Sequence, residues 1–188
     1  MNRFIIWQEY LPVLLGKTEG QKRGLKPLQS GRFQGYDVSV DASLTNEFST
    51  AAFRVGHSMV QGELPRLNEK FDAIGQISLH TTFLKASQFY KEGIVDELVR
   101  GMARQAGKIV GPSVTAELSQ QLFPDQKNPQ FGQDLVSINI QRGRDHGIPG
   151  YMQWRRDCKL STADNFAALK KQKALPDEVV DKFQSVYA

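Results

Sequence analysis

The residues best suited to chemistry lie in the stretch 50–59, where a histidine follows an arginine by three positions. On a helix this spacing places the imidazole of His57 and the guanidinium of Arg54 on the same side. Gly56 removes a side chain next to the histidine, which would let a flat group approach the backbone closely. One imidazole, one cation and one gap indicate a planar anion as ligand. The alternative is a core histidine in an amphipathic helix, beside a solvated arginine.

A second group of polar residues lies in the stretch 135–151, beside apolar residues with helical spacing. Asn139 and Arg142 are three residues apart and therefore share a helix side. If Asn139 is buried, its amide needs a partner, and a nitrogen of a ligating imidazole is one such partner. Arg142 could bind a carboxylate, with two hydrogen bonds where the geometry allows. For Asp145 and His146, at the helix end, a structural salt bridge or capping network is favoured.

The element that must position His57 is expected to be one helix from about residue 43 to residue 60. Its apolar residues fall on one stripe, which comprises Leu44, Phe48, Ala51, Val55 and Met59. Further helices are expected at residues 4–15, 83–90, 94–106, 112–122, 133–144, 151–158, 163–171 and 176–187. Long irregular segments are expected at 17–41, at 62–79 with an extended piece at 76–79, and at 123–132. The fold class is therefore mainly α.

The amino-acid composition argues for a globular domain and against membrane-spanning and disulfide-rich proteins. The chain has 188 residues, 40% hydrophobic and 23% charged, which suits one globular domain. No apolar run reaches the roughly 18 residues of a membrane-spanning helix. A single cysteine, Cys158, excludes an internal disulfide framework and a cysteine-rich metal site.

The net charge of +4 leaves a basic nucleic-acid-binding module as a remote alternative. Its phosphate contacts would be Arg142, Arg144, Arg155 and Arg156. Apolar residues surround Arg142, and acidic residues are interleaved elsewhere. We therefore expect no nucleic-acid partner.

Residues 135–151, followed by 154–158, resemble a signature of the animal haem peroxidases, within the peroxidase–cyclooxygenase superfamily. Residues 52–57 resemble the proximal-histidine motif of that family, and residues 9–16 resemble a third segment. The three segments occur in the family's order. The resemblance implies that residues 1–188 are part of a single haem peroxidase domain, truncated at both ends. Its helices would surround the proximal side of the haem.

The resemblance also assigns roles to four residues. His57 resembles the proximal axial ligand of the haem iron, and Arg54 and Arg142 resemble arginines at the haem propionates. Asn139 resembles the asparagine that hydrogen-bonds the far nitrogen of the proximal imidazole. A haem iron held by histidine needs a neutral imidazole. A partner on its other nitrogen sets the tautomer and the basicity, and the amide oxygen of Asn139 would be that acceptor.

For the whole protein, the resemblance implies a secreted enzyme with haem b that reduces hydrogen peroxide and oxidises a donor. The family's distal histidine and arginine, and its calcium ligands, belong to motifs upstream of Phe4, so the 188 residues alone are expected to show little turnover. Cys158 resembles a cysteine whose disulfide partner lies beyond residue 188. A non-catalytic haem-binding or adhesion relative is the alternative.

Overall fold

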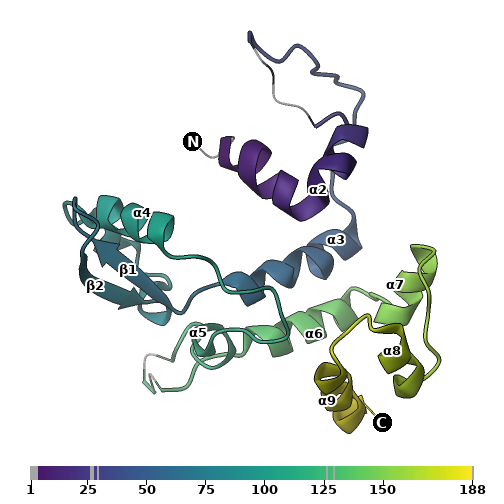
Figure 1. Ribbon diagram of the computed structural model, residues 1–188. Coiled ribbons are helices and arrows are strands. Elements are labelled where there is room, and N and C mark those ends of the chain that lie inside the picture. Colours follow the sequence, from purple (N-terminus) through teal and green to yellow (C-terminus); the bar gives the residue numbers. More distant parts are fainter. Residues whose placement is uncertain (1–3, 26–27, 29, 126, 129, 188) are drawn as a thin grey trace. The chain divides into compact units, whose positions relative to one another are not determined.

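The computed structural model describes residues 4–25, 28, 30–125, 127–128 and 130–187 (Figure 1). Most of its regular structure is helical, and two short strands form one antiparallel sheet. The predicted mainly α class is confirmed. The chain divides into two compact units, Met1–Ser43 and Leu44–Ala188.

The first unit contains a π-helix, η1 (Ile5–Tyr10), that runs directly into α2 (Leu11–Lys22). We expected the helix to end near Gly16. Gly16 does break it, with φ +76°, but helical structure resumes and continues to Lys22. Glu19 supports this second half, because its carboxylate accepts a 2.9 Å hydrogen bond from Arg23 four residues on. The loop predicted for 17–41 is therefore wrong over its first residues.

In the second unit, the helix expected over 43–60 consists of two pieces. These are α3 (Asn46–Thr50) and η2 (Ala52–Met59), a 3₁₀-helix. Ala51, at φ −127° and ψ −65°, separates them. The rings of Phe48 and Phe53 stack across the break, with centroids 5.3 Å apart. The expected apolar stripe does not face a core, because all five of its residues are exposed.

Residues 62–79, expected to be largely irregular, form a β-hairpin. β1 (Glu63–Leu67) pairs antiparallel with β2 (Ala73–Ser78). Helix α4 (Ile94–Arg104), which was predicted over 94–106, packs on β1 (Figure 1). The buried side chains of this layer are Leu67, Ile94 and Leu98. Arg66 of β1 and Glu97 of α4 form an ion pair at 2.7 Å.

The helical segments between the hairpin and α6 are shorter than the sequence predicted. Of the helix expected over 83–90, only a 3₁₀ turn is present, η4 (Ala86–Tyr90), and a second 3₁₀ turn, η3 (Leu79–Thr82), precedes it. Leu84, at φ +57°, interrupts the chain between them. The helix expected over 112–122 is reduced to α5 (Ala116–Ser119).

The last four helices agree with the sequence pattern to within three residues at each end. They are α6 (Leu135–Asp145), α7 (Tyr151–Asp157), α8 (Phe166–Gln172) and α9 (Asp177–Tyr187). Helices α8 and α9 pack together through the buried side chains of Leu169, Val179 and Val180. Val180 is fully buried.

Asp134 starts α6 by capping its backbone. One carboxylate oxygen accepts from the backbone N–H groups of Val136 at 2.8 Å and Ser137 at 3.3 Å, and the other accepts from the Ser137 hydroxyl at 2.7 Å. The bond from the Ser137 hydroxyl is the largest of the effects that lower the pKa of Asp134 below 3.8. The ionised carboxylate therefore holds the start of the helix that carries Asn139 and Arg142.

Replacing Asp134 with alanine is expected to lower the free energy of unfolding by about 1 kcal/mol, because two backbone donors lose their acceptor. The folded pKa lies below the unfolded one, so the stabilisation is present above the unfolded pKa. It is lost as the pH falls through the folded pKa. Urea unfolding of wild type and Asp134→Ala, followed by circular dichroism over a range of pH, measures both effects.

Asp134→Asn is the matched control, since asparagine also caps helices well but does not titrate. It should keep most of the stability at neutral pH. A difference between wild type and Asp134→Ala that does not shrink in acid would contradict the role of the ionised carboxylate.

Candidate functional site

His57 and Asn139, 82 residues apart in the sequence, are in contact. The side-chain Nδ2 of Asn139 lies 2.9 Å from Nδ1 of the His57 imidazole. Nη1 of Arg54 donates a hydrogen bond to Oδ1 of the same asparagine. One amide thus contacts both the histidine and the arginine. Three of the four predicted site residues lie together.

The 3₁₀ geometry of η2 accounts for the side shared by Arg54 and His57. In a 3₁₀-helix, side chains three residues apart eclipse one another. Arg54 and His57 therefore lie one above the other and reach the same residue of α6. Asn139 is partly buried there, one helical turn after the capped start of α6.

The orientation of the Asn139 amide follows from what each neighbour can donate. A guanidinium has only N–H donors, so the amide atom that faces Arg54 must be the oxygen. In this arrangement the amide NH₂ faces Nδ1 of His57. This differs from the expectation that the Asn139 oxygen accepts a hydrogen bond from the imidazole.

Burial is the larger cause that lowers the pKa of His57 below 6.5, and the positive charge of Arg54 is the second. Both favour the neutral imidazole, which is the form that binds metals. Two further observations fit a planar group with carboxylates. Nε of Arg54 is buried and hydrogen-bonds to no described residue. A Cβ on Gly56 would meet no described heavy atom within 4 Å, so the space beside His57 is open.

Arg142, the fourth predicted site residue, does not take part in the hydrogen bonds that join His57, Asn139 and Arg54. It is exposed on α6, one helical turn beyond Asn139, and its guanidinium makes no hydrogen bond or ion pair within the described ranges. Its guanidinium therefore stays available to a ligand. Nothing in its contacts distinguishes it from a solvated arginine.

His146 takes part in a structural network, as the sequence suggested. Its Nδ1 lies 2.8 Å from Oδ1 of Asn46 and 3.4 Å from the hydroxyl of Thr50. These contacts join the end of α6 to α3. Asp145 accepts a 2.8 Å hydrogen bond from Gln141. Neither residue forms a salt bridge with any described residue, so the capping alternative agrees with the structure.

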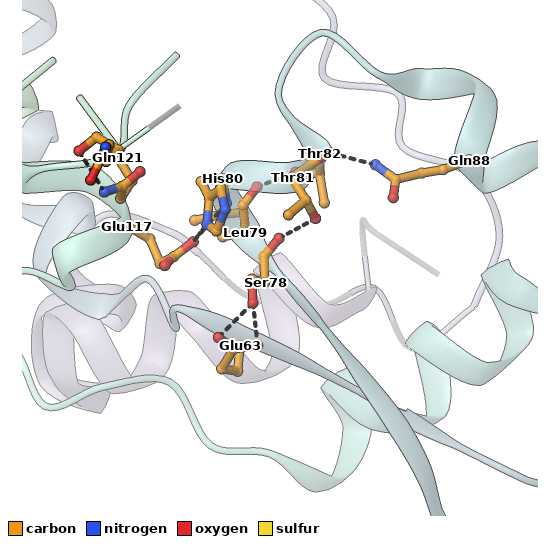
Figure 2. Close-up of polar contacts among 10 residues, drawn as sticks. Glu63, Ser78, Leu79, His80, Thr81, Thr82, Gln88, Glu117 and Gln121 are labelled. Atoms are coloured by element: carbon orange, nitrogen blue, oxygen red, sulfur yellow. Dashed lines mark hydrogen bonds and ion pairs between the residues drawn. The ribbon is translucent and has the colours of Figure 1, made fainter. Parts of the chain in front are cut away.

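His80 belongs to a different polar cluster. Figure 2 shows the Glu117 carboxylate against His80, and one oxygen accepts from the His80 backbone N–H at 2.7 Å and lies 2.6 Å from Nδ1. Nearby, both carboxylate oxygens of Glu63 accept from the Ser78 hydroxyl. The cluster ties η3 to α5. Sequence reasoning missed it, because no pattern links Glu117 to a histidine 37 residues away.

Comparison with known proteins identifies the family of this chain. The family model for the animal haem peroxidase matches residues 1–188. The chain belongs to this family. Among curated animal haem peroxidases, the mouse peroxidasin homolog is 41% identical over 187 residues, which cover 97% of this chain and 12% of that protein. Mouse lactoperoxidase is 36% identical over 94% of this chain and 25% of its own length.

A solved structure agrees with the family. Peroxidase A from Dictyostelium discoideum matches 98% of this chain with a TM-score of 0.75 and 28% identity, and the match covers 32% of that structure. The chain thus spans about a third or less of the length of these haem peroxidases. Whether the two compact units belong to one domain stays a prediction.

No helix in the described ranges is both long enough and apolar enough to cross a membrane. Nor do three or more histidine, cysteine or acidic side chains gather there in a way that could hold a metal ion. A haem iron needs no such group, because the porphyrin supplies four nitrogens and the protein one axial ligand.

Cys158 is exposed and free, and its pairing stays a prediction.

Proposed function

We propose that this chain forms the proximal side of a haem site, with His57 as the axial ligand of the iron. The observation that carries the proposal is the double contact of Asn139 with His57 and Arg54. It joins an imidazole, an amide and a cation from two elements far apart in the sequence. Membership of the animal haem peroxidase family makes haem the expected planar anion.

Each residue has a distinct task in the proposed site. His57 presents a neutral imidazole to the iron, and its lowered pKa keeps the proton from competing with the metal. Asn139 fixes the plane of the ring. Arg54 and Arg142 bind the propionates, since guanidinium groups suit carboxylates. Haem, when bound, supplies the redox chemistry by which a peroxidase reduces hydrogen peroxide and oxidises a donor.

The whole protein is proposed to be a secreted haem peroxidase, in line with the family. Peroxide cleavage also requires a general base and a group that stabilises developing charge on the distal side. The other two histidines each use Nδ1 in contacts within the protein. His146 is held by Asn46 and Thr50, and His80 by Glu117. Calcium is also expected in the full-length family member, and we propose that its ligands lie outside these 188 residues.

Titration of ferric haem with the purified chain tests the proposed site. A saturable shift of the Soret band at one haem per chain is expected. An unchanged spectrum at high protein concentration would refute haem binding by these residues.

The haem-loaded chain is expected to turn over hydrogen peroxide no faster than free haem at the same concentration. The expectation follows from the proposed assignment of this chain to the proximal side, where no side chain is placed to move the peroxide proton. Oxidation of a chromogenic donor measures the rate, and a full-length animal haem peroxidase serves as the positive control. Turnover comparable to that control would show that the chain carries its own distal residues.

A further inference from the structure

An apolar cavity of about 790 Å³ lies between α7, α8 and α9. Its volume falls within the roughly 300–1,000 Å³ of cavities that hold small molecules in proteins. The side chains that give it a chemical character are Tyr151, Met152, Phe166, Phe183 and Tyr187. None of the four residues expected to hold haem lines it. The cavity is therefore a separate place for a ligand.

Aromatic side chains from all three helices line the cavity. On α9, the rings of Phe183 and Tyr187 have centroids 6.3 Å apart and planes tilted by 45°. Tyr151 comes from α7 and Phe166 from α8. Tilted and offset arrangements are those in which aromatic rings attract one another. A flat aromatic body can therefore contact several of these rings at once, and it would cover the exposed surface of Tyr151, Phe183 and Tyr187.

A fixed positive charge stands next to one of these rings. The guanidinium of Arg155 lies over Tyr151, with Cζ 5.7 Å from the ring centroid, and Nη1 donates to the Tyr151 hydroxyl at 3.1 Å. Nε donates to the backbone oxygen of Ser161 at 2.6 Å, and Nη2 to its hydroxyl at 3.2 Å. All three acceptors are neutral, and Arg155 forms no ion pair with any described residue. Its charge is held in place but not compensated.

Tyr151 connects this charge to the cavity. The phenol oxygen accepts from Arg155, and a hydroxyl that accepts one hydrogen bond can still donate its own proton. Donation by a cation also polarises the hydroxyl and strengthens the bond that it donates. An anionic group at Tyr151 would accept this proton and meet the positive charge of Arg155. Arg155 is then a positioning residue, because it acts on the ligand through Tyr151.

We propose that the cavity between α7, α8 and α9 binds an aromatic anion. Its rings lie among the aromatic side chains of the cavity, and its single carboxylate or sulfonate accepts from the hydroxyl of Tyr151. The apolar wall supplies most of the affinity, and Tyr151 with Arg155 selects an anion over a neutral molecule of the same shape. The site uses no residue of the proposed haem site.

Fluorescence titration of the haem-free chain with two probes tests the proposal. The anion 8-anilinonaphthalene-1-sulfonate and the neutral N-phenyl-1-naphthylamine share the same rings, and only the first carries the charge. Both should bind saturably at one probe per chain. In Tyr151→Phe, which keeps the ring, the sulfonate should bind about tenfold more weakly, as loss of a hydrogen bond to a charged group predicts. The neutral probe should be unaffected, and an equal effect on both probes would overturn the anion site.

Replacing Arg155 with glutamine tests the part played by its charge. The sulfonate should bind several-fold more weakly and the neutral probe as before, because only the anion interacts with the cation. Arg144→Gln is the matched control, since it removes the same charge from an exposed position on α6. Equal weakening in both variants would trace the effect to net charge and overturn the role of Arg155.

A filled cavity provides a test that does not depend on polar groups. Leu175 lines the cavity, so Leu175→Trp should fill it and abolish binding of both probes. Val186→Trp adds the same ring to α9 at a residue that is 72% exposed and outside the cavity, and it should bind both probes like wild type. His57→Ala should do so as well. Probe binding that survives Leu175→Trp, or that is lost in His57→Ala, would place the probes elsewhere and overturn the proposal.

Sedimentation velocity distinguishes a small ligand from a second copy of the chain as the occupant of the cavity. Wild type and Leu175→Trp should sediment alike at every protein concentration. If wild type dimerises and Leu175→Trp is a monomer, another copy fills the cavity and the proposal is wrong.

Discussion

Replacing His57 with alanine is expected to abolish the Soret shift that the chain induces in ferric haem. The affinity for haem should fall by more than about 100-fold, because loss of a residue that merely supports a metal ligand already costs about 10- to 100-fold. The imidazole of His57 supplies the nitrogen that ligates the iron. Without it, Arg54 and Arg142 can still attract the haem propionates, but they cannot ligate the iron. Absorbance titration of both proteins measures the ratio.

Three controls separate ligation from folding in this experiment. His80→Gln and His146→Gln remove the other two histidines, which hydrogen-bond within the protein, and should leave the Soret shift in place. Free imidazole should restore the spectrum of His57→Ala, since it can occupy the space left by the side chain. Retention of the full shift by His57→Ala, or its loss only in His80→Gln, would assign the iron to another residue.

The partnership of Arg54 and His57 was predictable from their spacing alone. The predicted α-helix was wrong there, and the two residues nevertheless share a side in η2. The reason is that a separation of three residues gives neighbouring side chains in an α-helix and eclipsed ones in a 3₁₀-helix. The contact with Asn139 required the family resemblance, because no local pattern joins residues 82 positions apart.

The orientation of the Asn139 amide lay beyond the sequence. It depends on a third residue, Arg54, that competes with His57 for the same side chain. Hydrogen-bond donors and acceptors can be balanced only once all the neighbours of a group are known. The same limit applies to Glu117, whose position against His80 is set by the packing of α5 on η3.

The extended piece predicted at 76–79 overlaps β2, but the hairpin itself was missed, for reasons visible in its residues. Pro65 lies inside β1, where proline usually argues against a strand. The first four residues of β2 are exposed, so there is no alternation between buried and exposed positions to detect. For the segment 43–60 the error was the reverse: the sequence showed an apolar stripe, but the structure leaves it exposed. Its periodicity was real, but periodicity records side-chain type, whereas exposure depends on which element lies opposite.

Replacing Gly101 with alanine is expected to lower the free energy of unfolding by about 2–3 kcal/mol, at the upper end of the usual cost of overpacking. Gly101 lies in α4, where that helix crosses β1, and a Cβ there would sit 1.9 Å from the backbone oxygen of Pro65. A backbone atom cannot turn aside as a flexible side chain does. The helix must therefore move away from the hairpin and open the layer that buries Leu67 and Leu98.

The matched control for this prediction is Gly143→Ala, in the interior of α6. A Cβ at Gly143 would meet no described heavy atom within 4 Å. The higher helix propensity of alanine should therefore raise the free energy of unfolding by up to about 1 kcal/mol. Urea unfolding of the haem-free proteins compares the two glycines directly. Equal effects at both positions would mean that α4 does not approach β1 as closely as the structure shows, since propensity alone favours alanine at each.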